Sequence, residues 1–290
     1  MKKNIRTLVF YVVLIAIVIM LVATVFQSTE QEKIILGDVV EYFEDDRVTY
    51  CVINEDYYLT IIDIESYLER PDSVQHYVDR ALELFPEKVE LHLAEGSVLF
   101  RQKRYDEAVR ANKASLQYAA SDSLRSTIWG QIGDIYHQQA EEAEKESRAR
   151  KWRKKSYEAY ETAIGYNPDN YLVLNNWAYF LSLEERDLEH ALEMIERVAT
   201  LTDNNPTYMD THAWVLFKMG RLEEARQLLR KAIALDGQKS MELLVHYGDI
   251  LDAQGQRFMA ETYWKRALDK GYDKAAIEER LNRKPTDKKP

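Results

Sequence analysis

The chain has 290 residues, of which 46% are hydrophobic and 30% are charged. Its 39 Lys and Arg residues against 49 Asp and Glu residues give a formal charge of −10 at pH 7, which argues against a protein that binds nucleic acid by neutralising phosphates. With only 10 Gly and 6 Pro residues, the composition excludes low-complexity and collagen-like chains. Because Cys51 is the only cysteine, an internal disulfide and a cysteine-based zinc site are also excluded.

Residues 8–26 (LVFYVVLIAIVIMLVATVF) carry no charge and are predicted to form a transmembrane helix. At about 1.5 Å per residue, a helix of this length crosses the roughly 30 Å hydrocarbon core of a bilayer. The run is longer than the apolar region of a signal peptide, which favours a retained anchor over a cleaved signal. Lys2, Lys3 and Arg6 precede it, so the positive-inside rule places the tail 1–7 in the cytoplasm and the rest of the chain outside.

Residues 27–64 are predicted to form a small α+β unit just past the membrane. Asp38 and Glu41 have the spacing of a capping box, which predicts a short helix directly after Asp38. The stretch 47–54 (RVTYCVIN) alternates β-branched and aromatic residues, and 57–62 (YYLTII) has the composition of a second strand. The expected order is therefore a short helix followed by a hairpin.

The segment MKKNIRTLVFYVVLIAIVIM and the stretch ILGDVVEYFEDDRVTYCVINEDYYLTI resemble the N-terminus of FtsH-type membrane proteases, over residues 1–62. In that family this part is a transmembrane helix and the start of a small extracytoplasmic domain, which takes part in hexamer assembly and in contacts with membrane partners. The family's catalytic motifs, G-x-x-x-x-G-K-[ST] and H-E-x-x-H, do not occur in this sequence. The resemblance therefore implies an anchor and an assembly surface, with a membrane protease complex as a possible partner.

Small residues recur at fixed offsets along the rest of the chain. Gly96, Ala108 and Ser115 stand 12 and 7 positions apart. The same spacing recurs at Ala213, Ala225 and Ala232, and at Gly248, Ala260 and Ala267. Small residues at such offsets are what two packed helices need where their backbones come closest. Their return with a period of about 34 residues indicates a series of helix pairs.

This pattern resembles the tetratricopeptide repeat (TPR), whose W-x-x-L-G-x-x-Y core is matched by Trp129, Ile132, Gly133 and Tyr136. The resemblance implies a mostly α fold, with an α-solenoid over residues 65–284. We expect five repeats, preceded by a lone second helix at 72–86, and they lie near 89–122, 126–168, 171–205, 206–240 and 241–274. A polar capping helix is expected at 275–284, and the tail 285–290 is expected to be disordered.

The second of these repeats departs from the period, since Gly133 and Ser156 stand 23 positions apart instead of 12. The insertion holds an acidic run from Glu141 to Glu146 and a basic run from Arg148 to Lys155. We expect two lengthened helices whose charge blocks pair with each other. The alternative is a dedicated docking spike.

No pattern of catalytic residues is found, so we expect a protein that is not an enzyme and that needs no cofactor and no metal. None of the six histidines has a second His or Cys four residues away on one helical face. The sequence also lacks a glycine-rich phosphate loop and a G-x-S-x-G nucleophile elbow.

What remains is a binding surface. In TPR proteins the concave groove is lined by the first helix of each repeat, and mapping its positions onto this sequence gives Phe100, Asp134, Asn175, Tyr179, Asp210, Trp214, Phe217, Asp249 and Asp252. Aromatic side chains beside carboxylates suit an apolar partner segment with one or two basic groups, and a Trp214→Ala change should then reduce binding. The alternative is that Tyr179, Trp214 and Phe217 pack between neighbouring repeats.

The sequence therefore predicts a membrane-anchored, non-enzymatic scaffold or adaptor whose solenoid binds a protein or peptide partner outside the cytoplasm. A second hypothesis is a regulatory or assembly partner of an FtsH-type protease, acting through residues 1–62. A third is that the N-terminal segment and the repeats do not form a natural functional unit.

Overall fold

A computed structural model describes residues 33–36, 39–44, 47–52, 55–68, 70–236 and 239–283. Within these ranges lie thirteen α-helices, one short 3₁₀ helix and three strands, and none of the helices is long and apolar enough to cross a membrane. The predicted transmembrane segment 8–26 and tail 285–290 lie outside the described residues. The chain divides into two compact units, residues 1–86 and 87–290, which are taken in turn below.

The first unit begins with a three-stranded antiparallel sheet in the order β1-β2-β3, made of β1 (Lys33–Leu36), β2 (Val39–Glu44) and β3 (Arg47–Val52). In its register Lys33 lies opposite Tyr42, and Val39 lies opposite Val52. The short helix expected after Asp38 is wrong, since those residues form β2. Their sequence, VVEYFE, is rich in β-branched and aromatic residues, and this strand preference outweighs a capping signal.

The first unit also contains a helix pair, α2 (Glu55–Tyr67) and α3 (Pro71–Leu84). The strand expected at 57–62 is wrong, because these residues belong to α2. Tyr58 and Ile62, four positions apart, are both buried, as are Val74 and Val78 of α3. This spacing puts each pair of side chains on one helical face. The helix expected to stand alone at this point is therefore the second member of a pair.

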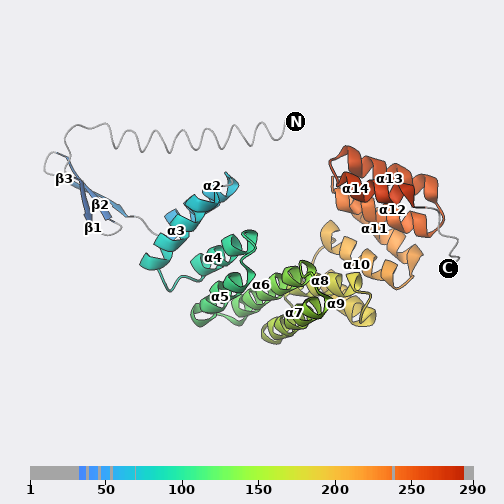
Figure 1. Ribbon diagram of the computed structural model, residues 1–290, viewed down its shortest axis with the longest axis horizontal. Helices are drawn as coiled ribbons and strands as arrows, with labels where there is room; N and C mark the ends of the chain where they lie inside the picture. Colours follow the sequence, from blue (N-terminus) through green and yellow to red (C-terminus); the bar gives the residue numbers. More distant parts are fainter. Residues whose placement is uncertain are drawn as a thin grey trace. The chain divides into compact units, whose positions relative to one another are not determined.

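The second unit is a stack of helix pairs in chain order, closed by a single helix (Figure 1). The five pairs are α4 (Val89–Arg101) with α5 (Tyr105–Ser115), α6 (Asp122–Glu141) with α7 (Glu146–Tyr166), α8 (Tyr171–Leu183) with α9 (Leu188–Leu201), α10 (Pro206–Lys218) with α11 (Leu222–Asp236), and α12 (Met241–Ala253) with α13 (Arg257–Asp269). The 3₁₀ helix η1 (Leu116–Tyr118) follows α5, and α14 (Lys274–Asn282) ends the stack. The mostly α, solenoid-type fold expected from the repeats is thus confirmed.

The small residues of the repeat lie where the two helices of a pair approach most closely. A Cβ atom at Gly133 would lie 2.4 Å from the ring of Tyr160, and one at Gly248 would lie 2.4 Å from Trp264 Nε1. Each of these glycines in α6 and α12 therefore makes room for a large aromatic side chain of the partner helix. The regular spacing of small residues in the sequence therefore reflects this packing between the two helices of a pair.

The inserted residues lengthen α6 and α7, which are the longest helices among the described residues at 20 and 21 residues. Arg153 lies 3.1 Å from Glu146 and 4.0 Å from Glu141, so the two charge blocks pair as expected. A third carboxylate, Glu184, lies 3.3 Å from Arg153 and comes from the end of α8. Trp152 stacks on Tyr136 of its own pair, with the ring centroids 5.7 Å apart.

Candidate partner-binding groove

The nine side chains expected to line the groove lie on the first helix of each pair. Phe100 lies on α4 and Asp134 on α6. The rest are distributed as Asn175 and Tyr179 on α8, Asp210, Trp214 and Phe217 on α10, and Asp249 and Asp252 on α12.

Asp134 is a carboxylate held by neutral donors alone. Tyr160 Oη donates a hydrogen bond of 2.6 Å to Oδ1 of Asp134, and Asn176 Nδ2 donates to the same atom at 3.2 Å. Burial raises the pKa of Asp134, and these two hydrogen bonds act in the opposite direction. None of the ion pairs within the described residues involves Asp134, so its negative charge has no counter-charge.

Asp210 and Trp214 of α10 are joined by His246 of α12. The Nδ1 atom of His246 lies 2.8 Å from Asp210 Oδ1, and the His246 ring stacks on Trp214 with centroids 4.2 Å apart. Trp214 is only 8% exposed, and Phe217 packs beside it with centroids 4.9 Å apart. These two aromatic rings thus contribute mainly to packing, in line with the alternative considered for them above.

Tyr179 is half-buried and faces negative charge from the following repeats. Burial is the largest cause of its raised pKa, and the carboxylate of Asp210 is the next. Tyr272 and Glu242 raise it further. Tyr179, Asp210 and Glu242 lie on three successive first helices, α8, α10 and α12, and the charges of both carboxylates act on the phenol. Glu242 accepts a hydrogen bond of 3.0 Å from the Ser240 hydroxyl.

Asn175, four residues before Tyr179 on α8, is buried at 9% exposure. Its Nδ2 atom donates to Asn176 Oδ1 at 3.2 Å, and its Oδ1 atom has no hydrogen-bond partner. Asn175 therefore contributes at most one unpaired acceptor to the groove.

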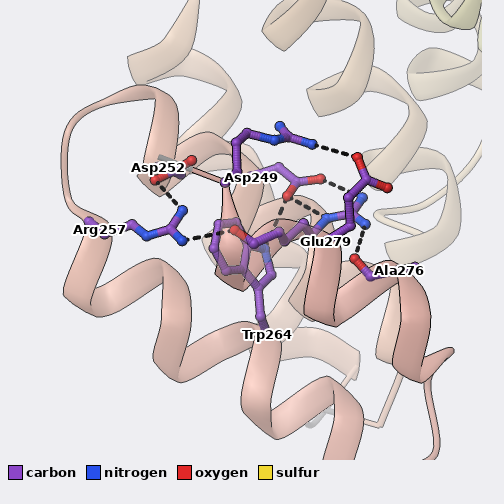
Figure 2. A network of polar contacts seen from close by, with 8 residues as sticks. Asp249, Asp252, Arg257, Trp264, Ala276 and Glu279 are labelled. Atoms are coloured by element: carbon purple, nitrogen blue, oxygen red, sulfur yellow. Dashed lines mark hydrogen bonds and ion pairs between the residues drawn. The ribbon is translucent and has the colours of Figure 1, made fainter. Parts of the chain in front are cut away.

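Asp249 and Asp252 are paired inside the fold (Figure 2). Asp249 accepts hydrogen bonds from Trp264 Nε1 at 3.0 Å and from Arg280 Nε at 2.8 Å. Asp252 lies 3.1 Å from the Arg257 guanidinium, which also donates to backbone carbonyls of α14. These carboxylates hold α14 against its neighbours, and a basic group of a partner would have to displace an arginine to reach them.

Sequence reasoning did not identify His246, Asn176 or Glu242. A signal for His246 was available, since it follows Asp210 by 36 positions, close to one repeat period. Residues one period apart on neighbouring first helices are expected to meet. Among the described residues, no three His, Cys, Asp or Glu side chains are grouped so that they could hold a metal ion.

Two segments of the chain, residues 59–123 and 208–239, match family models described as tetratricopeptide repeat. The first match begins inside α2 and includes most of the helix pair formed by α2 and α3. Over 86 residues the chain is 29% identical to the TPR repeat-containing protein PA4667 of Pseudomonas aeruginosa, a match that covers 30% of this chain and 14% of that protein.

Two solved structures share the fold over most of their length. PilF of Pseudomonas aeruginosa aligns with a TM-score of 0.58 and 17% identity, covering 79% of this chain and 97% of PilF. PilW, described as a widely conserved type IV pilus biogenesis factor, aligns with a TM-score of 0.62 and 14% identity, covering 79% of this chain and 98% of PilW. At these identities the likeness shows the fold alone. The tetratricopeptide repeats are confirmed, whereas the FtsH-type resemblance of residues 1–62 stays a prediction.

Proposed function

We propose that this chain of tetratricopeptide repeats is a non-enzymatic scaffold that binds a protein partner through the first helices α8, α10 and α12. The observation that carries the proposal is the carboxylate of Asp210 on α10, which lies 2.8 Å from His246 of α12 and has no lysine or arginine partner among the described residues. The charge of Asp210 also contributes to the raised pKa of the half-buried Tyr179 on α8. The fold itself is shared with PilW, which is described as a type IV pilus biogenesis factor.

The chemistry of this group favours a partner segment that is apolar and carries a basic side chain. A cation is attracted both by the face of an aromatic ring and by a neighbouring carboxylate. Among the ion pairs of the described residues, none joins Asp210 or Glu242 to an arginine or a lysine. Asp249 and Asp252, in contrast, are paired with Arg280 and Arg257. The C-terminal half of the groove therefore offers its negative charge at α10 and at the start of α12.

The scaffold is proposed to act at the cell membrane, held by one transmembrane helix at residues 8–26, with the repeats outside the cytoplasm. The uncharged run and the basic residues before it support this topology. Fusing alkaline phosphatase, which is active only outside the cytoplasm, to the C-terminus tests it. Phosphatase activity is expected from this fusion. If the phosphatase fusion is inactive and a second fusion, to a reporter that fluoresces only in the cytoplasm, is fluorescent, the orientation is the opposite of the proposed one.

The partner proposal is tested by co-purification of the cross-linked full chain from membranes. Asp210→Asn keeps an acceptor for His246 but removes the charge, and Tyr179→Ala removes the phenol. Both variants should retain several-fold less of the protein that the wild type retains. The matched control is Glu193→Gln on the second helix α9, whose side chain is 79% exposed. Equal retention by all four proteins would reject the groove.

The same preparation examines the alternative partner, an FtsH-type protease bound through residues 1–62. A full chain in which residues 1–62 are replaced by an unrelated anchor is compared with the native chain. If the protease is retained only by the native chain, the N-terminal segment is an assembly module. If both chains retain the same proteins, the repeats alone select the partner.

A further inference from the structure

A cavity of ≈ 270 Å³ lies between α4 and α6, the first helices of the first two pairs in the second unit. Phe100 of α4, Asp134 of α6 and Asn112 of α5 are among its lining residues. Its volume lies just below the range of about 300 to 1,000 Å³ that is usual for small-molecule sites. The cavity is therefore of a size for one side chain rather than for a folded element.

Asn112 brings an unsatisfied acceptor to this cavity. The residue is only 2% exposed, and its Nδ2 atom donates to the Ala108 carbonyl at 2.9 Å. Its Oδ1 atom has no hydrogen-bond partner. Exchanging the amide oxygen and nitrogen would set two acceptors against each other at Ala108, so this orientation of the amide is the favoured one. Buried polar atoms in native proteins are nearly always hydrogen-bonded, so this oxygen is suited to accept a hydrogen bond from a donor that enters the cavity.

Gly96 is what admits Asn112 to this place. A Cβ atom on residue 96 would lie 2.1 Å from Asn112 Nδ2, a distance that no real side chain tolerates. The small residue that marks the repeat in the sequence is thus also the residue that leaves room for the amide at the wall of the cavity.

Asp134 supplies the second acceptor. Its Oδ1 atom already accepts from Tyr160 and Asn176, whereas the contact of Oδ2 with Asn176 is longer, at 3.4 Å. Oδ2 therefore retains most of its capacity to accept. Arg101 also lines the cavity.

We propose that this cavity receives the ammonium group of a lysine side chain from the partner, which donates to Asp134 Oδ2 and Asn112 Oδ1. The alkyl stem of the lysine would lie against the ring of Phe100, where an adjacent cation is also favoured. The inference rests on the proposed function, because it names one anchor of the partner segment that the groove binds.

The acceptor geometry selects an ammonium over a guanidinium. A guanidinium is planar and binds best to both oxygens of a carboxylate at once. Here Oδ1 of Asp134 is already occupied by two donors, so such a bidentate contact is blocked. A compact ammonium with three donors can instead use two separate acceptors.

The test uses the ¹⁵N-labelled full chain in detergent and the probe Nα-acetyl-lysine methylamide, which needs no natural partner. The side-chain amide resonance of Asn112 should shift with the lysine probe in a saturable way. The norleucine analogue, which lacks the ammonium, should bind with at least tenfold lower affinity than the lysine probe. The arginine analogue should also bind more weakly than the lysine probe. Equal shifts with the norleucine probe would overturn the proposal.

Two variants locate the site. Asp134→Asn keeps an acceptor for Tyr160 and should weaken lysine binding at least tenfold, and Phe100→Leu should weaken it several-fold while keeping an apolar wall. Glu193→Gln, on the second helix α9 and outside the groove, should bind the probe as the wild type does. Unchanged binding by Asp134→Asn would overturn the assignment. The probe experiment does not need the partner, so the two proposals can fail separately. Unchanged probe binding by Asp134→Asn would contradict only the lysine site. Unchanged co-purification would contradict only the groove at α8 to α12.

Discussion

At the scale of single residues, the first helices carry ionisable side chains whose burial links stability to pH. His137 of α6 is 6% exposed and stacks on Phe180 of α8 with centroids 3.5 Å apart. Burial lowers the pKa of His137 to about 4, and the nearby Arg153 acts in the same direction while Glu184 opposes it. The neutral imidazole is thus part of the contact between two repeats.

Because its pKa is lowered in the folded chain, His137 should make the protein less stable in acid. Because the unfolded chain takes up a proton near pH 6.5 and the folded His137 only near pH 4, stability is complete above about pH 6.5 and falls as the pH drops towards 4. The loss is at most about 3 kcal/mol, from 1.36 kcal/mol per pKa unit. Melting curves between pH 7 and 4 should show a smaller decline for His137→Phe than for the wild type.

The matched control is His190→Gln on α9, whose side chain is 47% exposed. It should follow the wild-type decline. If His137→Phe and His190→Gln declined equally, His137 would not be the source of the acid sensitivity.

Asp134 should have the opposite effect on the pH dependence of stability. Burial raises its pKa above 3.8, so the folded chain keeps this proton to a higher pH than the unfolded chain does. Stability is then fully present at low pH and falls as the pH rises through the folded pKa. Asp134→Asn should melt at a higher temperature than the wild type at pH 7 and at nearly the same temperature below pH 3.8. A lower melting temperature at pH 7 would mean that Tyr160 and Asn176 stabilise the charge more than burial penalises it.

At the scale of elements, the helix pairs depend on small residues at their closest approach. Ala225 of α11 is fully buried within the core that α10 to α13 share. Ala225→Leu should overpack this site and lower the free energy of unfolding by about 1 to 3 kcal/mol, measured by urea denaturation. Ala234→Leu, at an exposed position of the same helix, should change it by less than about 0.5 kcal/mol. Equal stability of the two variants would contradict the register of the repeat.

The attachment of α14 depends on the pair formed by Arg280 and Asp249. Their side chains are 21% and 14% exposed, so the pair is only partly screened by water. Arg280→Ala should lower the free energy of unfolding by about 1 to 3 kcal/mol, since it leaves Asp249 with Trp264 alone. Adding Asp249→Asn should recover part of this loss. Arg283→Ala, which removes an exposed partner of Glu279, serves as the control, and a loss as large as that of Arg280→Ala would contradict the assignment.

Elements with helical spacing and small residues could be predicted from the sequence, as α4 to α14 show. The elements β2 and α2 could not, because both contain β-branched and aromatic residues whose local preference does not separate strand from helix. In α2 the buried pair Tyr58 and Ile62 decides the matter, and this depends on packing against α3.

The candidate site was predictable in its positions but not in its charges. The repeat register placed Asp249 and Asp252 on the correct helix. Their neutralisation by Arg280 and Arg257 depends on where α14 folds back, which no local pattern reveals. The fit of Asn112 against Gly96 likewise required the geometry of a helix pair.

At the scale of the whole molecule, the repeats of the second unit make contacts mainly with their neighbours. Stability in such a stack is a sum of local terms, so one pair can adjust to a partner while the others stay folded. The first helices supply two anchoring points, the phenol and carboxylates of α8 to α12 and the cavity between α4 and α6. A partner that uses both would have to run along several repeats.

The most direct test of a groove along the first helices is hydrogen exchange, measured by mass spectrometry on the full chain with and without its captured partner. We expect slower exchange in α8, α10 and α12, with α4 and α6 included when the partner presents a lysine, and little change in α9 and α11. Protection confined to α9 and α11, or to residues 33–52, would contradict this account and place the partner elsewhere on the chain.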